Sequence, residues 1–258
     1  MQRQKELLDS MINILCRERG QRVPLLYESE KARYFRALVN VRPPKLANDD
    51  FLKLQDEYLQ SDLNYKGITD IDTLSPVCDN IYLWRGDITT LKCDAIVNAA
   101  NSQMLGCFCP NHGCIDNAIH TYAGIQLRYE CAEIMAKQGG EEPTGGAKIT
   151  NAYNLPCRYI LHTVGPIVYG ELTEEIEMQL ASCYRSCLQL ADKYNLQSIA
   201  FCCISTGEFH FPNLRAAEIA IATVEEYKRK TASKIKVIFN VFKEKDYEIY
   251  ARLLKANH

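Results

Sequence analysis

The chain has 258 residues, of which 47% are hydrophobic and 24% charged, with a formal net charge of −2. These values are typical of a globular protein with one large domain or with a medium and a small one. They exclude a broad basic surface for nucleic acid, and the sequence contains neither an apolar stretch long enough for a bilayer nor a secretory signal. We therefore expect no nucleic-acid or membrane partner, and a cytoplasmic protein whose twelve cysteines are mostly buried, reduced thiols.

The N-terminal part of the chain has the apolar periodicity of helices and no convincing strand. Helices are predicted over residues 3–17, over 28–40, where the chain meets Pro43-Pro44, and onward from Asn48 as N-cap. Residues 61–76 are acidic, contain Gly67 and Pro76, and indicate a linker. We therefore divide the chain into a helical extension and linker, residues 1–75, and a second domain, residues 76–258.

After residue 78 short apolar runs alternate with long helical stretches. Strands are predicted near 81–84, 95–97, 159–161, 199–202 and 235–239, and helices over 115–137, 173–194, 213–230 and 245–255. The alternation, with nearly continuous apolar inner strands, predicts an α/β fold with a mostly parallel central sheet. Ligands of such sheets bind beyond the carboxyl ends of the strands.

Unusual loops follow the strands and should emerge at one edge of the sheet. They are Gly86–Thr89, Asn98–Ser102, Ser205–Pro212 and Asn240–Phe242. The third precedes a helix and contains Gly207, so its N–H groups are a plausible phosphate cradle. Taken alone, Asp87 is more often a turn residue, and Asn98 and Asn101 could simply bond their own loop.

A cluster of metal-ligand residue types follows the Asn98–Ser102 loop. Cys107, His112 and Cys114 have the spacing Cys-x4-His-x-Cys in a loop rich in glycine and proline. Thiolate and imidazole are ligands of tetrahedral Zn²⁺, and three protein ligands leave the fourth position that a catalytic metal needs. Cys109 leaves an alternative open, because a fourth protein ligand would make the site closed and structural.

Taken together, these loops resemble one family over about residues 80–255. The shared motifs are Gly-Asp-Ile-Thr at 86–89, Asn-Ala-Ala-Asn at 98–101, Ile-Asp-Asn-Ala-Ile-His at 115–120, Gly-Gly-Ala-Lys-Ile-Thr at 145–150, His-Thr-Val-Gly-Pro at 162–166 and Ser-Thr-Gly at 205–207. They stand in the order found in macrodomains. The cysteine-rich segment and the helical N-terminus with Arg42-Pro43-Pro44 are similar to those of zinc-containing macrodomains.

The resemblance implies a three-layer α/β/α macrodomain with a mixed, mostly parallel sheet and an N-terminal helical extension. It also implies an ADP-ribose pocket, in which Asp87, the Ile88 N–H and Phe242 meet the adenine. Backbone groups for the diphosphate would come from Ser205, Thr206, Gly207, Glu208 and Phe209. Asn101 and Asp116 would face the distal ribose as the catalytic pair, beside Zn²⁺ on Cys107, His112 and Cys114. Cys109 is variable in such proteins, which favours the three-ligand site.

The function implied is zinc-dependent removal of mono-ADP-ribose from protein side chains, with Asp116 aligning or deprotonating a water. Asp or Glu linkages are expected, because a carboxylate leaves well. The alternatives are a non-catalytic ADP-ribose reader, an O-acetyl-ADP-ribose deacetylase, and a structural zinc module that recruits a partner. The resemblance further suggests a partnership with an ADP-ribosylating sirtuin.

Overall fold

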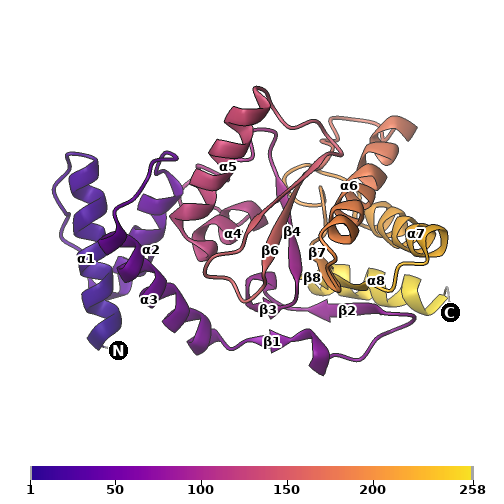
Figure 1. The fold of residues 1–258 in the computed structure, drawn as a ribbon, viewed down its shortest axis with the longest axis horizontal. Coiled ribbons are helices and arrows are strands. Elements are labelled where there is room, and N and C mark those ends of the chain that lie inside the picture. Colours follow the sequence, from indigo (N-terminus) through magenta and orange to yellow (C-terminus); the bar gives the residue numbers. More distant parts are fainter. Residues whose placement is uncertain (1, 257–258) are drawn as a thin grey trace.

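A six-stranded sheet forms the centre of the computed structural model, which describes residues 2–256 (Figure 1). Its order is β2-β8-β7-β4-β6-β5; β5 is antiparallel to β6, and the other neighbours are parallel. The strands are β2 Ile81–Arg85, β8 Lys236–Val241, β7 Ser198–Phe201, β4 Ala95–Ala100, β6 Tyr159–Val164 and β5 Ala147–Asn151. The inner strands are almost wholly buried, as in sheets covered on both faces.

Helices cover both faces of this sheet. On one side lie α4 Ile115–Ala123 and α5 Ile125–Gln138; on the other lie α6 Glu174–Lys193, α7 Asn213–Thr231 and α8 Glu244–Ala256 (Figure 1). The main hydrophobic core fills the space between the layers. The predicted three-layer α/β architecture with a mixed, mostly parallel sheet is confirmed.

Three helices precede the sheet and pack beside α4 and α5 (Figure 1). They are α1 Gln2–Glu18, α2 Glu28–Asn40 and α3 Asp49–Lys66. Their apolar faces form a separate hydrophobic cluster, to which α5 contributes Ile125. Asn48 caps α3 as predicted, since its Oδ1 accepts the Phe51 N–H at 2.8 Å. The helical N-terminal region expected from the sequence is therefore present.

The linker predicted over residues 61–76 is wrong in its first part, because α3 continues to Lys66. Leu63 is buried, and an ion pair of 2.8 Å joins Asp62 to Lys66 one turn later. The helix ends at Gly67, whose φ of 85° suits glycine. The Asp62–Lys66 ion pair and the buried Leu63 side chain thus stabilise the helix through a segment whose acidic composition had indicated an irregular linker.

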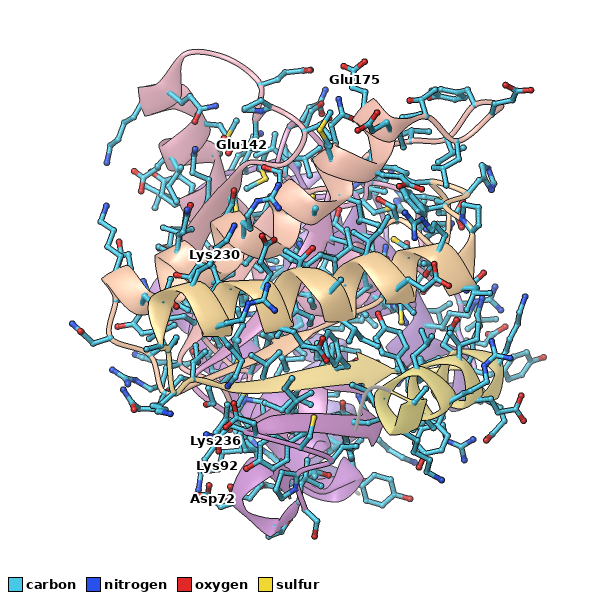
Figure 2. All side chains as sticks on the ribbon, turned by 90° about the vertical axis from the view of Figure 1, so that its right-hand side faces the viewer. Asp72, Lys92, Glu142, Glu175, Lys230 and Lys236 are labelled. Carbon is cyan, nitrogen blue, oxygen red and sulfur yellow. The ribbon has the colours of Figure 1, made fainter. Side chains whose placement is uncertain are left out.

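A short two-stranded sheet, which the sequence did not predict, follows α3. β1 Thr69–Asp70 pairs in parallel with β3 Leu91–Lys92. Nearby, Lys236 Nζ lies 2.7 Å from Asp72 Oδ1, and Figure 2 shows these two side chains close to Lys92. Such exposed ion pairs contribute at most about 1 kcal/mol each. Backbone pairing with β3 therefore does more than charge to hold β1 in place.

The single helix predicted over 115–137 is two helices, because Gly124 interrupts it with a φ of 103°. A Cβ at this position would lie 2.6 Å from Gln55 Nε2 of α3. The adjacent Ile125 N–H donates to Gln55 Oε1 at 2.9 Å. Close approach of α3 therefore requires glycine here, and the break allows α4 and α5 to take different directions.

All twelve cysteines are free thiols. Most are buried in the two cores, and Cys109 is the one that is exposed. Within residues 2–256, no helix combines the length and the apolar composition that crossing a membrane requires.

Candidate active site

Loops from distant parts of the sequence meet at the carboxyl edge of the parallel strands β2, β8, β7 and β4, as predicted. Two of them are joined directly. The Gly86 N–H donates to the Val241 carbonyl at 3.1 Å, and Asn240 Nδ2 donates to the Gly86 carbonyl at 3.0 Å. This edge is where parallel α/β sheets bind their ligands.

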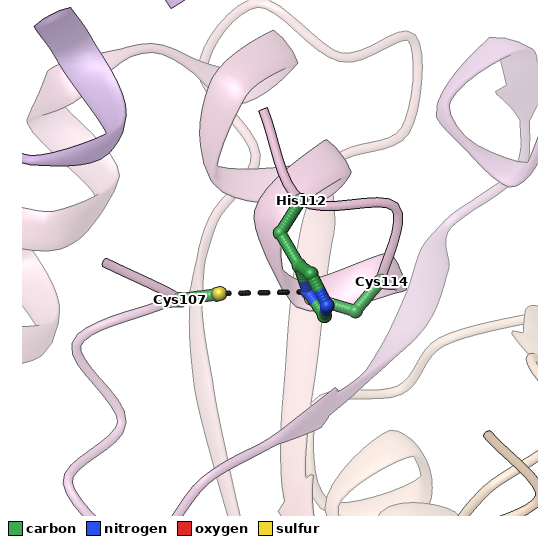
Figure 3. Close-up of side chains that lie close together, drawn as sticks. All are labelled: Cys107, His112 and Cys114. Atoms are coloured by element: carbon green, nitrogen blue, oxygen red, sulfur yellow. Dashed lines mark hydrogen bonds between the residues drawn. The ribbon is translucent and has the colours of Figure 1, made fainter. Parts of the chain in front are cut away.

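The loop of residues 105–114, here called the metal loop, brings three candidate ligands together (Figure 3). The ligand atoms of Cys107, His112 and Cys114 all lie within 4.8 Å of one another, and Cys107 Sγ is 3.7 Å from His112 Nδ1. Ligands at ordinary zinc distances in a tetrahedron are separated by about 3.5–3.8 Å. The spacing of these side chains therefore fits a single Zn²⁺ ion.

Cys114 is also the N-cap of α4. Its Sγ accepts the Asn117 N–H at 3.4 Å. Burial raises the pKa of the Cys114 thiol to about 12, so the thiol by itself stays protonated at neutral pH. A bound cation deprotonates such a thiol, and the positive end of the α4 dipole favours the thiolate.

Cys109 does not join the three other ligand types. Its side chain is exposed, and it lies outside the group formed by Cys107, His112 and Cys114. Its carbonyl accepts a hydrogen bond of 3.0 Å from Asn117 Nδ2. The protein therefore offers a donor set of two thiols and one imidazole, which fits a zinc site with one open position.

Asp116 occupies the first turn of α4 and is 5% exposed. Its Oδ1 accepts from Asn98 Nδ2 at 2.8 Å and lies 3.6 Å from His120 Nε2. Burial raises the pKa of Asp116 to about 6, against the opposing effects of the Asn98 hydrogen bond and the Arg128 charge. A carboxyl with this pKa is largely ionised at neutral pH and can still take up a proton, as a general base must.

Asn98 of β4 and His162 of β6 fix the orientation of Asp116 through hydrogen bonds. Because an amide nitrogen only donates, His162 Nδ1, 3.1 Å from Asn98 Nδ2, is the acceptor. His162 Nε2 then carries the proton and donates to Thr150 Oγ1 at 2.9 Å. Burial lowers the pKa of His162 to about 3, which keeps the ring neutral. The alternative that Asn98 bonds its own loop is wrong, since its amide holds Asp116 and His162.

A second group of ligand types, His120, Cys131 and His162, lies buried behind Asp116. Both ring nitrogens of His162 already have hydrogen-bond partners. No sequence pattern indicates this group, because its members are far apart in the chain and look like ordinary core residues. We interpret it as packing and hydrogen-bonded support for Asp116.

Asn101 ties the end of β4 to the metal loop. Its Nδ2 donates to the Gly106 carbonyl at 3.1 Å, and its Oδ1 accepts the Gln103 N–H at 3.1 Å. Gly106 has a φ of 79°, and a Cβ there would lie 2.8 Å from the His120 ring. The start of the metal loop is therefore fixed by Asn101 on one side and by close packing on the other.

The Ser205–Pro212 loop, which precedes α7, has free hydrogen-bond donors. In the part of the chain that the structure describes, the N–H groups of Gly207, Glu208 and Phe209 have no acceptor. Ser205 has a φ of 63°, and its buried Oγ has no partner. Consecutive unpaired N–H groups before a helix are typical of a phosphate-binding nest.

Glu208 brings this loop next to the metal loop. Its Oε1 lies 3.7 Å from His112 Nε2. The other ring nitrogen of His112, Nδ1, faces Cys107. Metal-binding histidines commonly direct their second nitrogen to a carboxylate. The candidate phosphate nest and the candidate ligands thus belong to one site.

At the other end of this edge, Asp87 behaves as a turn residue. Its Oδ1 accepts the Thr89 N–H at 3.0 Å and the Thr89 hydroxyl at 2.7 Å. Ile88 is 2% exposed, whereas Phe242 is 76% exposed just after β8. The second Asp87 oxygen has no partner within the described residues, and Phe242 presents an open aromatic ring.

Several residues that contact the metal loop were missed in the sequence. Arg36 and Asn40 reach it from α2, and Arg128 reaches it from α5. Arg128 Nε donates to the Leu105 carbonyl at 2.7 Å, and its guanidinium lies 4.3 Å from the centre of the Phe108 ring. No periodicity or spacing signals such contacts, because they form between helices and a loop that meet only in the folded chain.

Comparison with known proteins agrees with this geometry. The Macro domain family matches residues 97–220. A point mutant of the Oceanobacillus iheyensis macrodomain, solved with ADPR, is 38% identical at a TM-score of 0.65, over 72% of this chain and 97% of that chain. The Trypanosoma brucei macrodomain in complex with ADP-ribose is 33% identical at a TM-score of 0.66, over 85% of this chain and 94% of that chain. The chain belongs to the macro domain family.

Curated relatives extend the match to nearly the whole chain. A protein from Treponema medium is 54% identical over 97% of this chain and 99% of its own length. A Staphylococcus aureus (strain Mu50) protein is 50% identical over 98% of this chain and 97% of its own length. Both are named "Protein-ADP-ribose hydrolase". The prediction that the chain is an enzyme of this class is thereby confirmed.

Proposed function

We propose that this protein is a zinc-dependent hydrolase that removes mono-ADP-ribose from aspartate or glutamate side chains of proteins. The observation that carries the zinc dependence is the gathering of Cys107, His112 and Cys114 beside the unpaired N–H groups of the Ser205–Pro212 loop. A protein that only binds ADP-ribose does not need a set of metal ligands next to the diphosphate. Membership of the zinc-containing macrodomain subfamily is part of this proposal.

The residues of the site divide the work along the ligand. The N–H groups of Gly207, Glu208 and Phe209 would hold the diphosphate and so position the distal ribose, since positioning can lower a barrier by several kcal/mol. Asn101 would face that ribose, and Asp116 would align or deprotonate the attacking water. Bound zinc supplies Lewis-acid polarisation of a nearby oxygen and lowers the pKa of water. The neutral His162 and Asn98 keep the Asp116 carboxylate oriented.

The origin of the substrate is a further part of the proposal. A carboxylate is a good leaving group, which favours Asp or Glu linkages over linkages to nitrogen. An ADP-ribosylating sirtuin as the supplier has its support in the resemblance to zinc-containing macrodomains. A cytoplasmic location is supported by the twelve free thiols, which persist in reducing compartments.

The division of the chain into residues 1–75 and 76–258 is also proposed. In its support, α1, α2 and α3 have a hydrophobic cluster of their own. The family match begins later in the chain, at residue 97.

Release of ADP-ribose tests the activity directly. Purified protein should release free ADP-ribose from a protein mono-ADP-ribosylated on Glu, and should act at least about 100-fold more slowly on an Arg-linked counterpart, since a difference of about 3 kcal/mol in leaving ability has this size. Chromatography of the released nucleotide measures both. Binding of ADP-ribose without release would favour the reader, and turnover of O-acetyl-ADP-ribose alone would favour the deacetylase.

The adenine end of the site yields a binding prediction. Asp87→Ala should weaken ADP-ribose binding about tenfold, the effect of losing one good hydrogen bond of about 1.4 kcal/mol. Because Asp87 also caps its own turn, Asp87→Asn is the matched variant: its carbonyl can still accept from Thr89, and its amide cannot accept from adenine. Calorimetry should find both variants weakened. Unchanged affinity in Asp87→Asn would remove Asp87 from the adenine site.

A further inference from the structure

We infer that α2 is a working part of the metal site, with Arg36 as a positioning residue that holds the metal loop in its ligand-gathering shape. This inference rests on the proposed zinc site. It assigns a role to a helix that lies outside the sheet-based fold and, judged by sequence alone, could simply pack.

The Arg36 guanidinium donates hydrogen bonds to both the metal loop and α4. Its Nη2 donates to the carbonyl of His112 at 3.0 Å and to Asn117 Oδ1 at 2.7 Å, and its Nε donates to the same oxygen at 3.2 Å. One planar guanidinium thus fixes the backbone of a candidate ligand relative to the first turn of α4. An ammonium is a point charge and cannot reproduce this geometry.

Asn117 relays the contact to the rest of the loop. It has no exposed surface, and its Nδ2 donates to the Cys109 carbonyl at 3.0 Å. Its backbone N–H donates to Cys114 Sγ at 3.4 Å. Arg36 therefore acts on His112 directly and on the Cys114 turn through one buried amide.

A second residue of α2 braces the tip of the same loop. Asn40 is 1% exposed; its Oδ1 accepts the Asn111 N–H at 2.9 Å, and its Nδ2 donates to Thr121 Oγ1 at 2.9 Å. Asn111 has a φ of 56°, a conformation that costs on the order of 1 kcal/mol unless the surroundings hold it. The residue before His112 is thus kept in an unfavourable conformation by a helix from the N-terminal region.

These braces matter because the metal loop is irregular between β4 and α4 and has few bonds of its own. A loop that is ordered before the ion arrives loses less conformational entropy on binding than a loose one. Arg36 and Asn40 supply that order from outside the loop. Removing Arg36 should therefore weaken metal binding without removing any ligand.

The test measures metal affinity and coordination, and does not depend on turnover. The variants are Arg36→Met and Arg36→Lys, with Arg33→Met as the matched control, because Arg33 is an exposed arginine on the same helix. Zn²⁺ affinity is measured by competition with a chromophoric chelator, and the geometry by the absorption spectrum of Co²⁺-loaded protein. Arg36→Met should bind Zn²⁺ roughly 10- to 100-fold more weakly and shift the Co²⁺ bands. Arg36→Lys should fall between it and the wild type, and Arg33→Met should match the wild type.

The outcomes separate this inference from the zinc proposal. Wild-type Zn²⁺ affinity and Co²⁺ spectrum in Arg36→Met would overturn the role of Arg36 and leave the zinc site intact. Equal Zn²⁺ affinity in wild type and Cys107→Ala would instead overturn the zinc site itself. ADP-ribose binding reports whether each variant folds, and if Arg36→Met does not fold, Arg36→Lys is judged by the same two results.

Discussion

Cys107→Ala and His112→Ala should each lower turnover by roughly a thousandfold, the effect of losing about 4 kcal/mol of transition-state stabilisation from a Lewis acid. ADP-ribose binding should change far less, because the unpaired N–H groups of the Ser205–Pro212 loop remain. Single-turnover release of ADP-ribose and calorimetry measure the two quantities separately.

Cys109→Ala is the matched control for this prediction. Cys109 lies in the same loop, but its exposed side chain stands outside the group of candidate ligands. We expect near wild-type turnover and stoichiometric zinc by elemental analysis. If turnover survives removal of the metal by a chelator, the zinc mechanism is wrong; if Cys109→Ala loses its zinc, the site is closed by a fourth ligand.

Asp116→Asn should lower turnover by about 10²- to 10⁴-fold, the range for removal of a general base. In the wild type, kcat/KM should reach a plateau above about pH 7. It should fall about tenfold per unit as the pH drops below the Asp116 pKa of about 6, because the protonated carboxyl cannot accept a proton. This acidic limb should be absent from the residual activity of Asp116→Asn.

Folding stability supplies an independent check on Asp116. Its pKa in the folded protein is raised, so the folded state binds this proton more tightly than the unfolded chain. Asp116 should therefore make the protein less stable as the pH rises from about 4 to about 6, a trend that urea unfolding can measure and that Asp116→Asn should lack. Asp50→Asn, at an exposed position on α3, should keep the wild-type trend in both experiments. An acidic limb that persists in Asp116→Asn would assign the titration to another group.

Much of the fold was predictable because its signals are local. Apolar runs such as 95–97 and 199–202 are buried on both faces, and they mark parallel strands by themselves. Strand β5 was missed because it lies at the sheet edge, where residues such as Lys148 and Thr150 break the apolar pattern. The break at Gly124 was missed because its cause is Gln55, which is far away in the sequence.

The candidate site shows the same difference between local signals and contacts made by residues distant in the sequence. Cys107, His112 and Cys114 could be grouped from spacing, because one short loop carries all three. The supports of the site could not be grouped in this way: Arg36 and His162 reach it from helices and strands that assemble only in the folded chain. Residues that act on a ligand can thus be identified from sequence patterns more readily than the residues that hold those groups in place.

The exposure of Cys109 has a practical consequence. Among the twelve thiols it is the one that is exposed, and it lies two residues from Cys107. A maleimide dye should therefore attach at this position first, without any engineered cysteine. The native protein thus carries a labelling handle at the rim of its candidate active site, where fluorescence can follow the arrival of cations and nucleotides in real time.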